Sequence, residues 1–419
     1  MSMVEQFFSV KYAGQQNLFE GLAIWKTKAY REIQGTYPVI SLSFANLKEP
    51  SYELTRQKVC DQLQQLYTEH AYIWESGILK GADKSFFERM LHNEKVEYVD
   101  ATLALYKLSS FMYQYYGKKV LILLDEYDTP MQEAYINDYW NERSLLNAAF
   151  KTNPWLERAI MTGITRVSKE SIFSDLNNLK VITTTSDEYA DAFGFTEKEV
   201  FEALEERGLG SEKQKVKEWY DGYRFGNADV YCPWDVINHV DRLCGEPDAK
   251  PQSYWINTSG NGLVKRFIDK ANKTTRDEIE RLISGETIEK QVSLELTYDE
   301  IDTTIDNLWS VLFTTGYLTQ TGMTESGAYK LVIPNKEVRE VYKLQIQEWF
   351  KRTVMSNKEQ LKNFWKAFDG GDTKAVENYL NRTLSNSISV FDTKARDEEK
   401  ESSYHTLLVG LLVGNADWL

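Results

Sequence analysis

Apolar residues in the first part of the chain form short continuous runs, separated by longer stretches with helical spacing. The runs that predict strands are Tyr37–Phe44, Val120–Leu124 and Arg158–Thr162. Helical spacing covers about Tyr52–Tyr72 and Val99–Tyr116, and a polar helix carries Asn141–Phe150. Strands that alternate with helices of this length are joined by crossovers, so the pattern predicts a parallel α/β sheet with helices on both faces. The shorter run Val181–Thr184 predicts a further strand near the sheet edge.

The first residues predict an amphipathic helix. The apolar side chains on its predicted face are Met3, Val4, Phe7, Phe8 and Tyr12, and Gly14 follows as a C-cap. Two interpretations stand. The segment is an ordinary N-terminal helix, or it is the helix that follows a buried strand and a glycine-rich loop in a longer domain.

The pattern changes from Phe195 onward. Glu-rich amphipathic helices reach about Ile288 and are interrupted by the aromatic segment Trp219–Gly226. A helical stretch and two short strands come next, at Tyr298–Thr315, Tyr317–Thr321 and Tyr329–Ile333. A helix followed by a hairpin is compatible with a winged-helix-like module, and the alternative is a small α+β subdomain that binds nothing.

The end of the chain is predicted to be mostly helical. Helical spacing runs over Tyr342–Leu384, and the polar run Asp392–Glu401 predicts a solvated linker. A chain of 419 residues is too long for one compact domain. We expect an α/β core at 1–194, a helical lid with the winged-helix-like module at 195–345, and a helical linker at 346–419 that leads into a further domain.

Composition narrows the class of protein. The chain is 42% hydrophobic and 27% charged, which is typical of globular proteins, and it has no run of 18 apolar residues and no secretory signal. Three scattered cysteines (Cys60, Cys232 and Cys244) and four isolated histidines disfavour a disulfide framework, a zinc site or a histidine metal centre. We therefore expect a cytoplasmic location and no membrane partner. The net charge of -14 disfavours a generally basic nucleic-acid-binding surface.

The main candidate chemistry lies at the end of the run Val120–Leu124, where Asp125 and Glu126 follow five aliphatic residues. Carboxylates at the carboxyl end of a buried parallel strand lie where α/β sheets bind ligands. In P-loop nucleotide hydrolases this is the Walker B element, whose Asp holds Mg²⁺ and whose Glu orients the attacking water. Its partner, the phosphate loop G-x-x-x-x-G-K-[ST], occurs nowhere in the 419 residues. The alternative for Asp125 and Glu126 is a polar strand end that forms a turn with Asp128.

Three further features have two interpretations each. Arg166 follows the strand Arg158–Thr162, where such ATPases place a cation facing the γ-phosphate, or else it pairs with Glu170 or Asp175. Asp128 is alternatively the partner of a basic group in the lid. The aromatic residues of Trp219–Phe225 form a structural turn or, in the minority interpretation, stack on adenine.

Several motifs, in this order along the chain, resemble those of a bacterial AAA-ATPase-like family that is abundant in gut Bacteroidetes. They are Lys119–Asp128, Thr162–Ser168, Trp219–Gly226, Tyr231–Asn238, Tyr254–Asn261 and Ile333–Val338. The resemblance implies a P-loop ATPase domain fused to a C-terminal nuclease domain of the PD-(D/E)XK type. It also implies ATP and Mg²⁺ as ligands, with Asp125, Glu126 and Arg166 at the site.

The chain departs from the family pattern at both ends. Family members carry Arg-Arg-Phe-Gly-Lys-[Ser/Thr] directly before a helix like Met1–Tyr12, and this chain starts after that loop. Tyr404–Leu412 looks like the first helix of the nuclease domain, and the chain stops at Leu419 before the carboxylates and Lys of such a domain. We therefore expect a chain truncated at both ends, defective in ATP binding and hydrolysis. His405, which would lie near a nuclease site, is expected to be solvated or partly packed.

Three functional hypotheses follow. The chain is an ATPase-like domain that lacks its phosphate loop and acts by interaction or not at all, or it is a fragment of a genuine ATPase-nuclease. Otherwise it is a winged-helix nucleic-acid binder with an ATPase-like scaffold. The acids of the helix before the predicted hairpin disfavour this last hypothesis; they are Asp299, Glu300, Asp302 and Asp306. The protein or nucleic-acid partner and the oligomeric state stay open.

Overall fold

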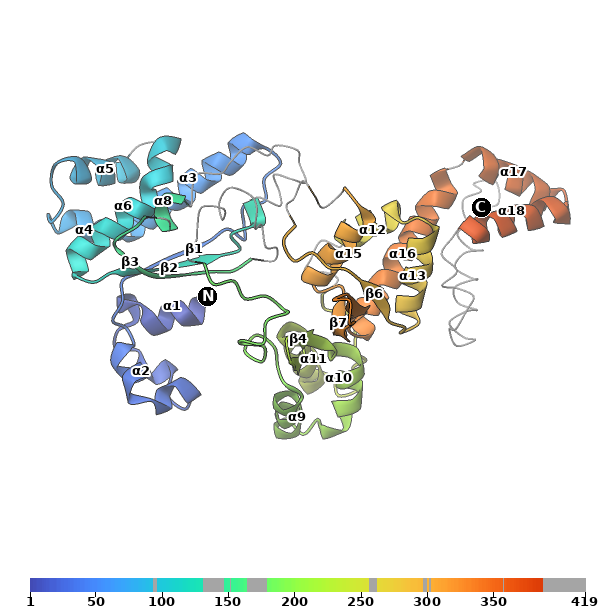
Figure 1. The fold of residues 1–419 in the computed structure, drawn as a ribbon, viewed down its shortest axis with the longest axis horizontal. Helices are drawn as coiled ribbons and strands as arrows, with labels where there is room; N and C mark the ends of the chain where they lie inside the picture. Colours follow the sequence, from blue (N-terminus) through green and yellow to red (C-terminus); the bar gives the residue numbers. More distant parts are fainter. Residues whose placement is uncertain are drawn as a thin grey trace. The chain divides into compact units, whose positions relative to one another are not determined.

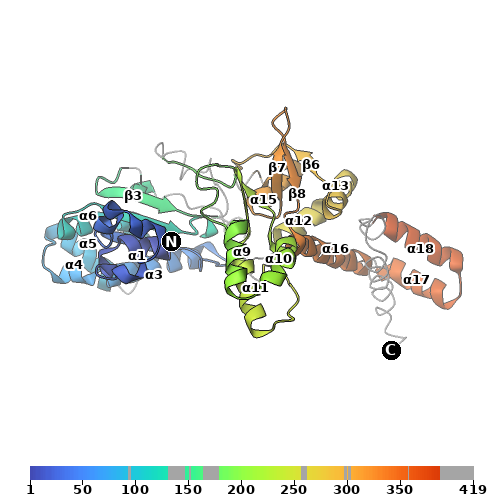
Figure 2. The same cartoon turned by 90° about the horizontal axis from the view of Figure 1, so that it is seen from below.

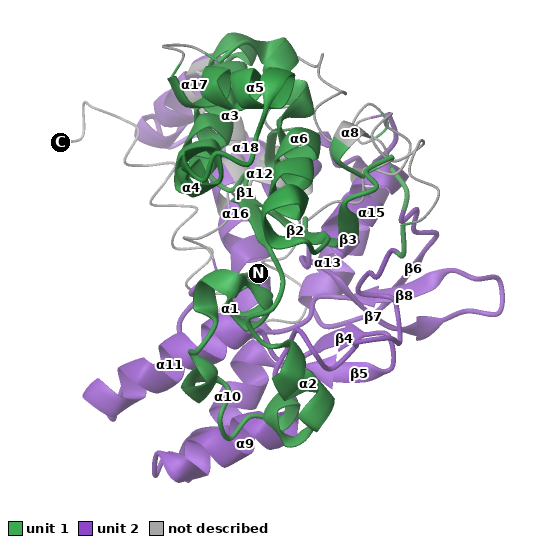
Figure 3. Ribbon diagram, turned by 90° about the vertical axis from the view of Figure 1, so that its left-hand side faces the viewer, with its two compact units in different colours: residues 1–180, 295–301 green, residues 181–294, 302–419 purple. Residues whose placement is uncertain are grey.

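The computed structural model describes residues 1–92, 96–130, 147–150, 152–163, 179–255, 262–296, 300, 303–356 and 358–386. The chain divides into two compact units (Figure 3). Unit 1 comprises residues 1–180 and 295–301, and unit 2 comprises residues 181–294 and 302–419. The expected three-part division at residues 194 and 345 stays a prediction.

The described part of unit 1 contains a parallel three-stranded sheet. Its strands are β1 (Val39–Ser43), β2 (Val120–Asp125) and β3 (Leu156–Met161), with β2 in the middle. Leu42 of β1 pairs with Leu124, and Leu124 pairs with Met161 of β3. The first five residues of β2 are buried, as expected for a central parallel strand that is covered on both faces. The predicted strands and their parallel direction are confirmed.

Helices cover both faces of this sheet. Figure 1 shows α3, α5 and α6 on one side of the sheet and α1 on the other. Val39, Leu121 and Leu123 pack against Val4 and Phe8 of α1, and the alternate side chains of the same strands point to the opposite face. The helices and 3₁₀ turns are α1 (Ser2–Phe8), η1 (Val10–Tyr12), η2 (Gln16–Leu18), η3 (Ala23–Lys26), α2 (Lys28–Ile33), α3 (Tyr52–Glu69), α4 (Ala71–Glu75), α5 (Gly81–His92), α6 (Tyr98–Tyr116) and α8 (Asn147–Phe150).

The N-terminal helix is shorter than the sequence predicts. It ends at Phe8, and Met3 is 66% exposed rather than packed. The reason lies in Ser9, whose backbone is extended and forms a parallel bridge with Tyr37 just before β1. The chain therefore leaves the helix to pair with a distant segment, which local hydrophobic spacing cannot reveal.

The prediction of a strand at Val181–Thr184 is wrong. The segment has no strand conformation, and Val181 and Ile182 are exposed. Thr183 closes a local turn instead, because its N–H donates to Ser186 Oγ (3.1 Å) and its hydroxyl contacts that of Thr185 (2.9 Å). Threonine hydroxyls compete with sheet pairing in this way.

Unit 2 combines helices with two small antiparallel sheets. Figure 2 shows β6, β7 and β8, the strands of one of them. One sheet is the hairpin of β4 (Tyr223–Phe225) and β5 (Ala228–Val230), and the other has the order β6-β8-β7. The remaining elements are α9 (Glu197–Glu206), η4 (Gly210–Glu212), α10 (Lys213–Tyr220), α11 (Pro233–Gly245), α12 (Gly262–Lys270), α13 (Lys273–Ile283), β6 (Ile288–Lys290), α15 (Ile305–Thr314), β7 (Thr319–Met323), β8 (Tyr329–Val332), α16 (Lys336–Ser356), α17 (Lys358–Asp369) and α18 (Thr373–Asn386).

The predicted helix Tyr298–Thr315 is interrupted: Glu300 is helical, residues 303 and 304 are not, and α15 covers Ile305–Thr314, while residues 298, 299, 301 and 302 lie outside the described part of the chain. Thr304 caps α15 by accepting a hydrogen bond from the N–H of Asn307 (3.2 Å), so that the helix starts at Ile305. The strand predicted at Tyr317–Thr321 begins two residues later than predicted, at Thr319. The hairpin that follows α15 is present, with β7 and β8 antiparallel.

Several sequence predictions fall outside the described residues. They concern Arg166, residues 141–146 of the polar helix, the linker Asp392–Glu401, the segment Tyr404–Leu412 and His405. Among the described helices, none combines the length and the apolar character that a membrane span requires.

Candidate functional site

The carboxyl ends of the three parallel strands lie side by side in unit 1. Ser43 at the end of β1 is in register with Asp125 at the end of β2. The N–H of Phe44 donates to Asp125 O (2.9 Å), and the N–H of Thr162 donates to Leu124 O (3.0 Å). These bonds extend the sheet by one residue on each side of β2. Residues that follow the strands therefore share one edge, as predicted for Asp125 and Glu126.

Asp125 has a partner that the sequence did not point out. The hydroxyl of Thr162, one residue past β3, donates a hydrogen bond to Asp125 Oδ1. Asp125 is half-buried, and its Oδ2 makes no hydrogen bond within the described part of the chain. The two residues form a carboxylate–hydroxyl pair at the strand ends. Its only sequence signal is the Thr-Gly at the end of the third predicted strand, Arg158–Thr162.

Glu126 has an uncommon backbone conformation. Its φ is 55°, in the left-handed region that residues other than glycine adopt rarely. Thr129 holds the turn, because its N–H donates to Glu126 O (3.1 Å) and its hydroxyl donates to Glu126 Oε2 (3.2 Å). Such conformations cost roughly 1–3 kcal/mol and cluster at functional sites. Asp125 is thus the last residue of the central strand, and Glu126 follows it on a constrained turn.

Asp128 is a buried residue next to Gly163, two residues past the end of β3. It is only 1% exposed, and a Cβ atom built on Gly163 would come within 2.5 Å of Asp128 Oδ1 and 2.6 Å of Tyr127 Cε1. The N–H of Tyr127 donates to Thr162 O (3.0 Å). Only glycine fits at position 163 without a shift of the turn 125–128. The two motifs that follow β2 and β3 are therefore packed directly against each other.

The donor set at this edge is of the kind that Mg²⁺ uses. Mg²⁺ is commonly held by one or two carboxylates together with waters and substrate phosphates. Asp125 and Thr162 supply a carboxylate and a hydroxyl of this type. Among the described residues no three His, Cys, Asp or Glu side chains are grouped to hold a metal alone. The described residues of this edge therefore fit a metal that is also coordinated by phosphate.

The aromatic segment Trp219–Gly226 has a structural role at Tyr220. Its ring is fully buried, its hydroxyl donates to Gln252 O (2.9 Å), and the N–H of Gln252 donates back to that hydroxyl (3.2 Å). A buried ring with both polar positions used is not available to stack on adenine. For Tyr220 the structural interpretation is therefore favoured.

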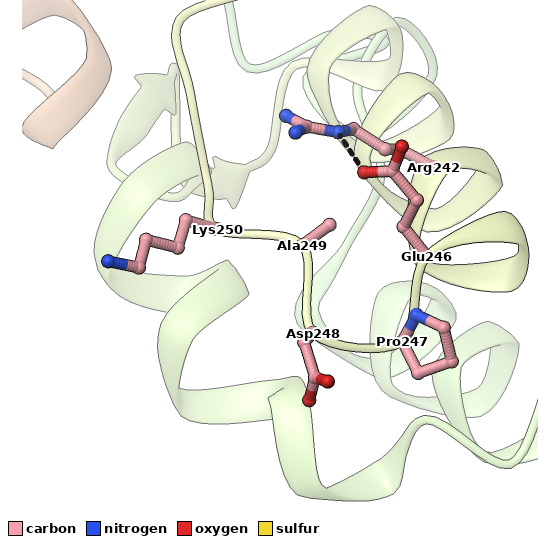
Figure 4. Close-up of a pocket in the computed structure, with 6 residues that line it drawn as sticks. All are labelled: Arg242, Glu246, Pro247, Asp248, Ala249 and Lys250. Atoms are coloured by element: carbon pink, nitrogen blue, oxygen red, sulfur yellow. Dashed lines mark hydrogen bonds and ion pairs between the residues drawn. The ribbon is translucent and has the colours of Figure 1, made fainter.

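An open hollow of about 460 Å³ lies in unit 2 beside the C-terminal end of α11 (Figure 4). Arg242, its main polar group, donates to Glu246 Oε2 (3.4 Å) and to Gln252 Oε1 (2.6 Å). The Arg242 cation is thus already paired with residues of its own unit, and Asp248 and Lys250 also line the hollow.

Two comparisons with known proteins give a match to this chain. An uncharacterized protein in the vnfD 5' region of Azotobacter chroococcum mcd 1 is 26% identical over 234 residues. That match covers 53% of this chain and 42% of the relative, so the chain spans less than half of the relative's length. Residues 1–173 match the model of the AAA-ATPase-like family, described as predicted AAA-ATPase. The matched range contains Asp125, Glu126 and Arg166, the three residues that the sequence predicts for the site.

Proposed function

We propose that residues 1–173 form a nucleotide-binding domain of the ATPase type that takes ATP together with Mg²⁺. The observation that carries the proposal is the carboxylate pair at the carboxyl end of the central buried strand, with Thr162 beside Asp125. This position matches the ligand crevice of α/β folds. The family match over the same residues supports it.

Each residue has a proposed role. Asp125 would hold Mg²⁺, with the hydroxyl of Thr162 fixing the orientation of its carboxylate. Bound Mg²⁺ would neutralise charge on the β- and γ-phosphates. Glu126 orients the attacking water through the carboxylate that Thr129 positions. Arg166 would stabilise negative charge on the γ-phosphate.

The 419 residues contain no G-x-x-x-x-G-K-[ST] loop, so they lack the backbone N–H groups and the Lys that such a loop provides for the phosphates. We therefore propose that this chain by itself hydrolyses ATP at a negligible rate. In that state it would act by interaction with another segment or partner, or not at all.

The fold indicates where a phosphate-loop strand would dock. The described helices between β1 and β3 lie on one face of the sheet, and α1 lies on the other (Figure 1). A right-handed crossover whose helix lies on one face of a parallel sheet leads to the next strand in one direction across the sheet. A crossover whose helix lies on the other face leads in the opposite direction. A parallel strand that led through α1 to β1 would therefore lie on the β3 side, and the open position there is the outer edge of β3. Among the described strands β3 pairs only with β2, so its other edge has backbone groups that a further strand could pair with.

A turnover assay tests the proposal. We expect no ATP hydrolysis above background by the purified chain. A version with a strand and a G-x-x-x-x-G-K-[ST] loop fused ahead of Met1 should hydrolyse ATP, and Glu126→Gln in that version should stop turnover. Robust hydrolysis by the chain alone that disappears in Glu126→Gln would mean that another segment replaces the loop.

An interaction module in unit 2 is the alternative function. α15 followed by the β7-β8 hairpin, with β6 on the far side of β8, supports a winged-helix-like arrangement. Nucleic-acid binding by α15 is not favoured, because Leu308–Phe313 are buried and Asp306 lies in its first turn. A protein partner would suit this module better than a polyanion.

A further inference from the structure

Three segments of unit 2 that resemble family motifs meet at the carboxylate of Glu337. Glu337 lies in the first turn of α16 and is 1% exposed. Its Oε1 accepts hydrogen bonds from Ser253 Oγ (3.0 Å), from the N–H of Tyr254 (2.6 Å) and from the N–H of Trp255 (2.7 Å). These donors are of the kind that stabilise an ionised carboxylate.

A second buried carboxyl group lies beside it. Asp235, in the first turn of α11, is also 1% exposed and contacts Glu337 through their side chains. Asp235 Oδ1 receives no hydrogen bond from the described residues, and neither carboxyl group forms a salt bridge within that part of the chain. Two ionised carboxylates in contact and shielded from water would repel strongly.

Among the described residues that interact with the pair, none supplies a compensating cation. His239, one turn further along α11, is fully buried, and burial lowers its pKa, which keeps the imidazole neutral. Burial also raises the pKa of Cys232 to about 12, so its thiol stays protonated. The other titratable groups that interact with the pair are tyrosines from α10, β4 and the segment before α12, namely Tyr220, Tyr223 and Tyr254.

We propose that Asp235 keeps its proton in the folded protein and donates it to Glu337, so that one shared proton is a pH-sensitive link between α11 and the start of α16. The proton turns a repulsive contact into a hydrogen bond. Burial, with the neighbouring charge of Glu337 as the next cause, raises the pKa of Asp235 from 3.8 to about 8. The link is therefore fully stabilising below the unfolded pKa of 3.8, weakens as pH rises, and is lost above about 8.

Spectroscopy on the full chain tests the protonation directly. With ¹³C-labelled aspartate, the infrared carbonyl stretch of a protonated carboxylic acid should be present at about pH 6, where ordinary aspartates are ionised. It should persist in Asp241→Asn, an exposed control on the same helix, and vanish in Asp235→Asn. In Glu337→Gln the proton should leave at lower pH, because the neighbouring charge is gone. This second variant keeps the test decisive if Asp235→Asn folds poorly. An ionised Asp235 at about pH 6 would overturn the proposal.

The pH dependence of unfolding gives a second, independent readout. Between about pH 5 and 7 the free energy of unfolding of the wild type should fall as the pH rises. Its slope against pH should exceed that of Asp235→Asn by the equivalent of one bound proton, because the amide of this variant donates to Glu337 at every pH. Asp241→Asn should follow the wild type. Equal slopes for all three proteins would show that Asp235 carries no extra proton.

Discussion

The close approach of Gly222 to Pro334 makes a sharp prediction about unit 2. Gly222 precedes β4 with φ 111°, and a Cβ built on it would lie 2.0 Å from the carbonyl oxygen of Pro334, just before α16. A backbone oxygen cannot rotate away as a side chain can. We expect Gly222→Ala to lose about 1–2 kcal/mol to the left-handed backbone and about 1–3 kcal/mol more to the clash.

Gly327 provides the matched control in the same unit. Its φ is 81°, and nothing lies within 4 Å of the corresponding Cβ, so Gly327→Ala should lose only the backbone part, about 1–2 kcal/mol. Urea unfolding of both variants gives the free energies of unfolding from the midpoints. Gly222→Ala should be the less stable by about 1–3 kcal/mol. Equal losses would refute the close contact between the two segments.

Two further substitutions test local packing. Gly163→Ala should destabilise unit 1 by about 1–3 kcal/mol, because its Cβ would collide with the buried Asp128, and a thermal shift of less than a degree would contradict that contact. Thr196→Ala should lower the free energy of unfolding by about 1 kcal/mol, because it removes the capping box at the start of α9. The control is Lys198→Ala, at an exposed position of the same helix, which should change that free energy by no more than about 0.5 kcal/mol in urea unfolding.

The sequence predicted the parts of the fold that depend on local pattern. Val120–Leu124 is apolar throughout because β2 is covered on both faces, and its flanking strands were recognisable from similar runs. The alternation with helices was enough to predict parallel pairing. The position of Asp125 and Glu126 at the strand end followed from these elements.

Contacts between distant segments could not be predicted in the same way. The bond from Thr162 to Asp125 and the contact of Gly163 with Asp128 depend on strand register, which one strand alone does not specify. The prediction of a strand at Val181–Thr184 failed because threonine also suits turns, in which its hydroxyl forms local hydrogen bonds. The pair of Asp235 and Glu337 lies between two helices whose contact has no local sequence signal.

Calorimetric titration of the fusion protein with ATP, in the presence and absence of Mg²⁺, tests the central claim about Asp125 most directly. The fusion carries an added strand and a G-x-x-x-x-G-K-[ST] loop ahead of Met1, and we expect its ATP binding to depend on Mg²⁺. Asp125→Ala should abolish the metal dependence and leave the fold intact, because a half-buried carboxylate at a strand end contributes little to the core. Glu126→Gln should bind as the parent does. If the fusion binds no ATP, or if Asp125→Ala keeps the same metal dependence, Asp125 and Glu126 are only a polar strand end.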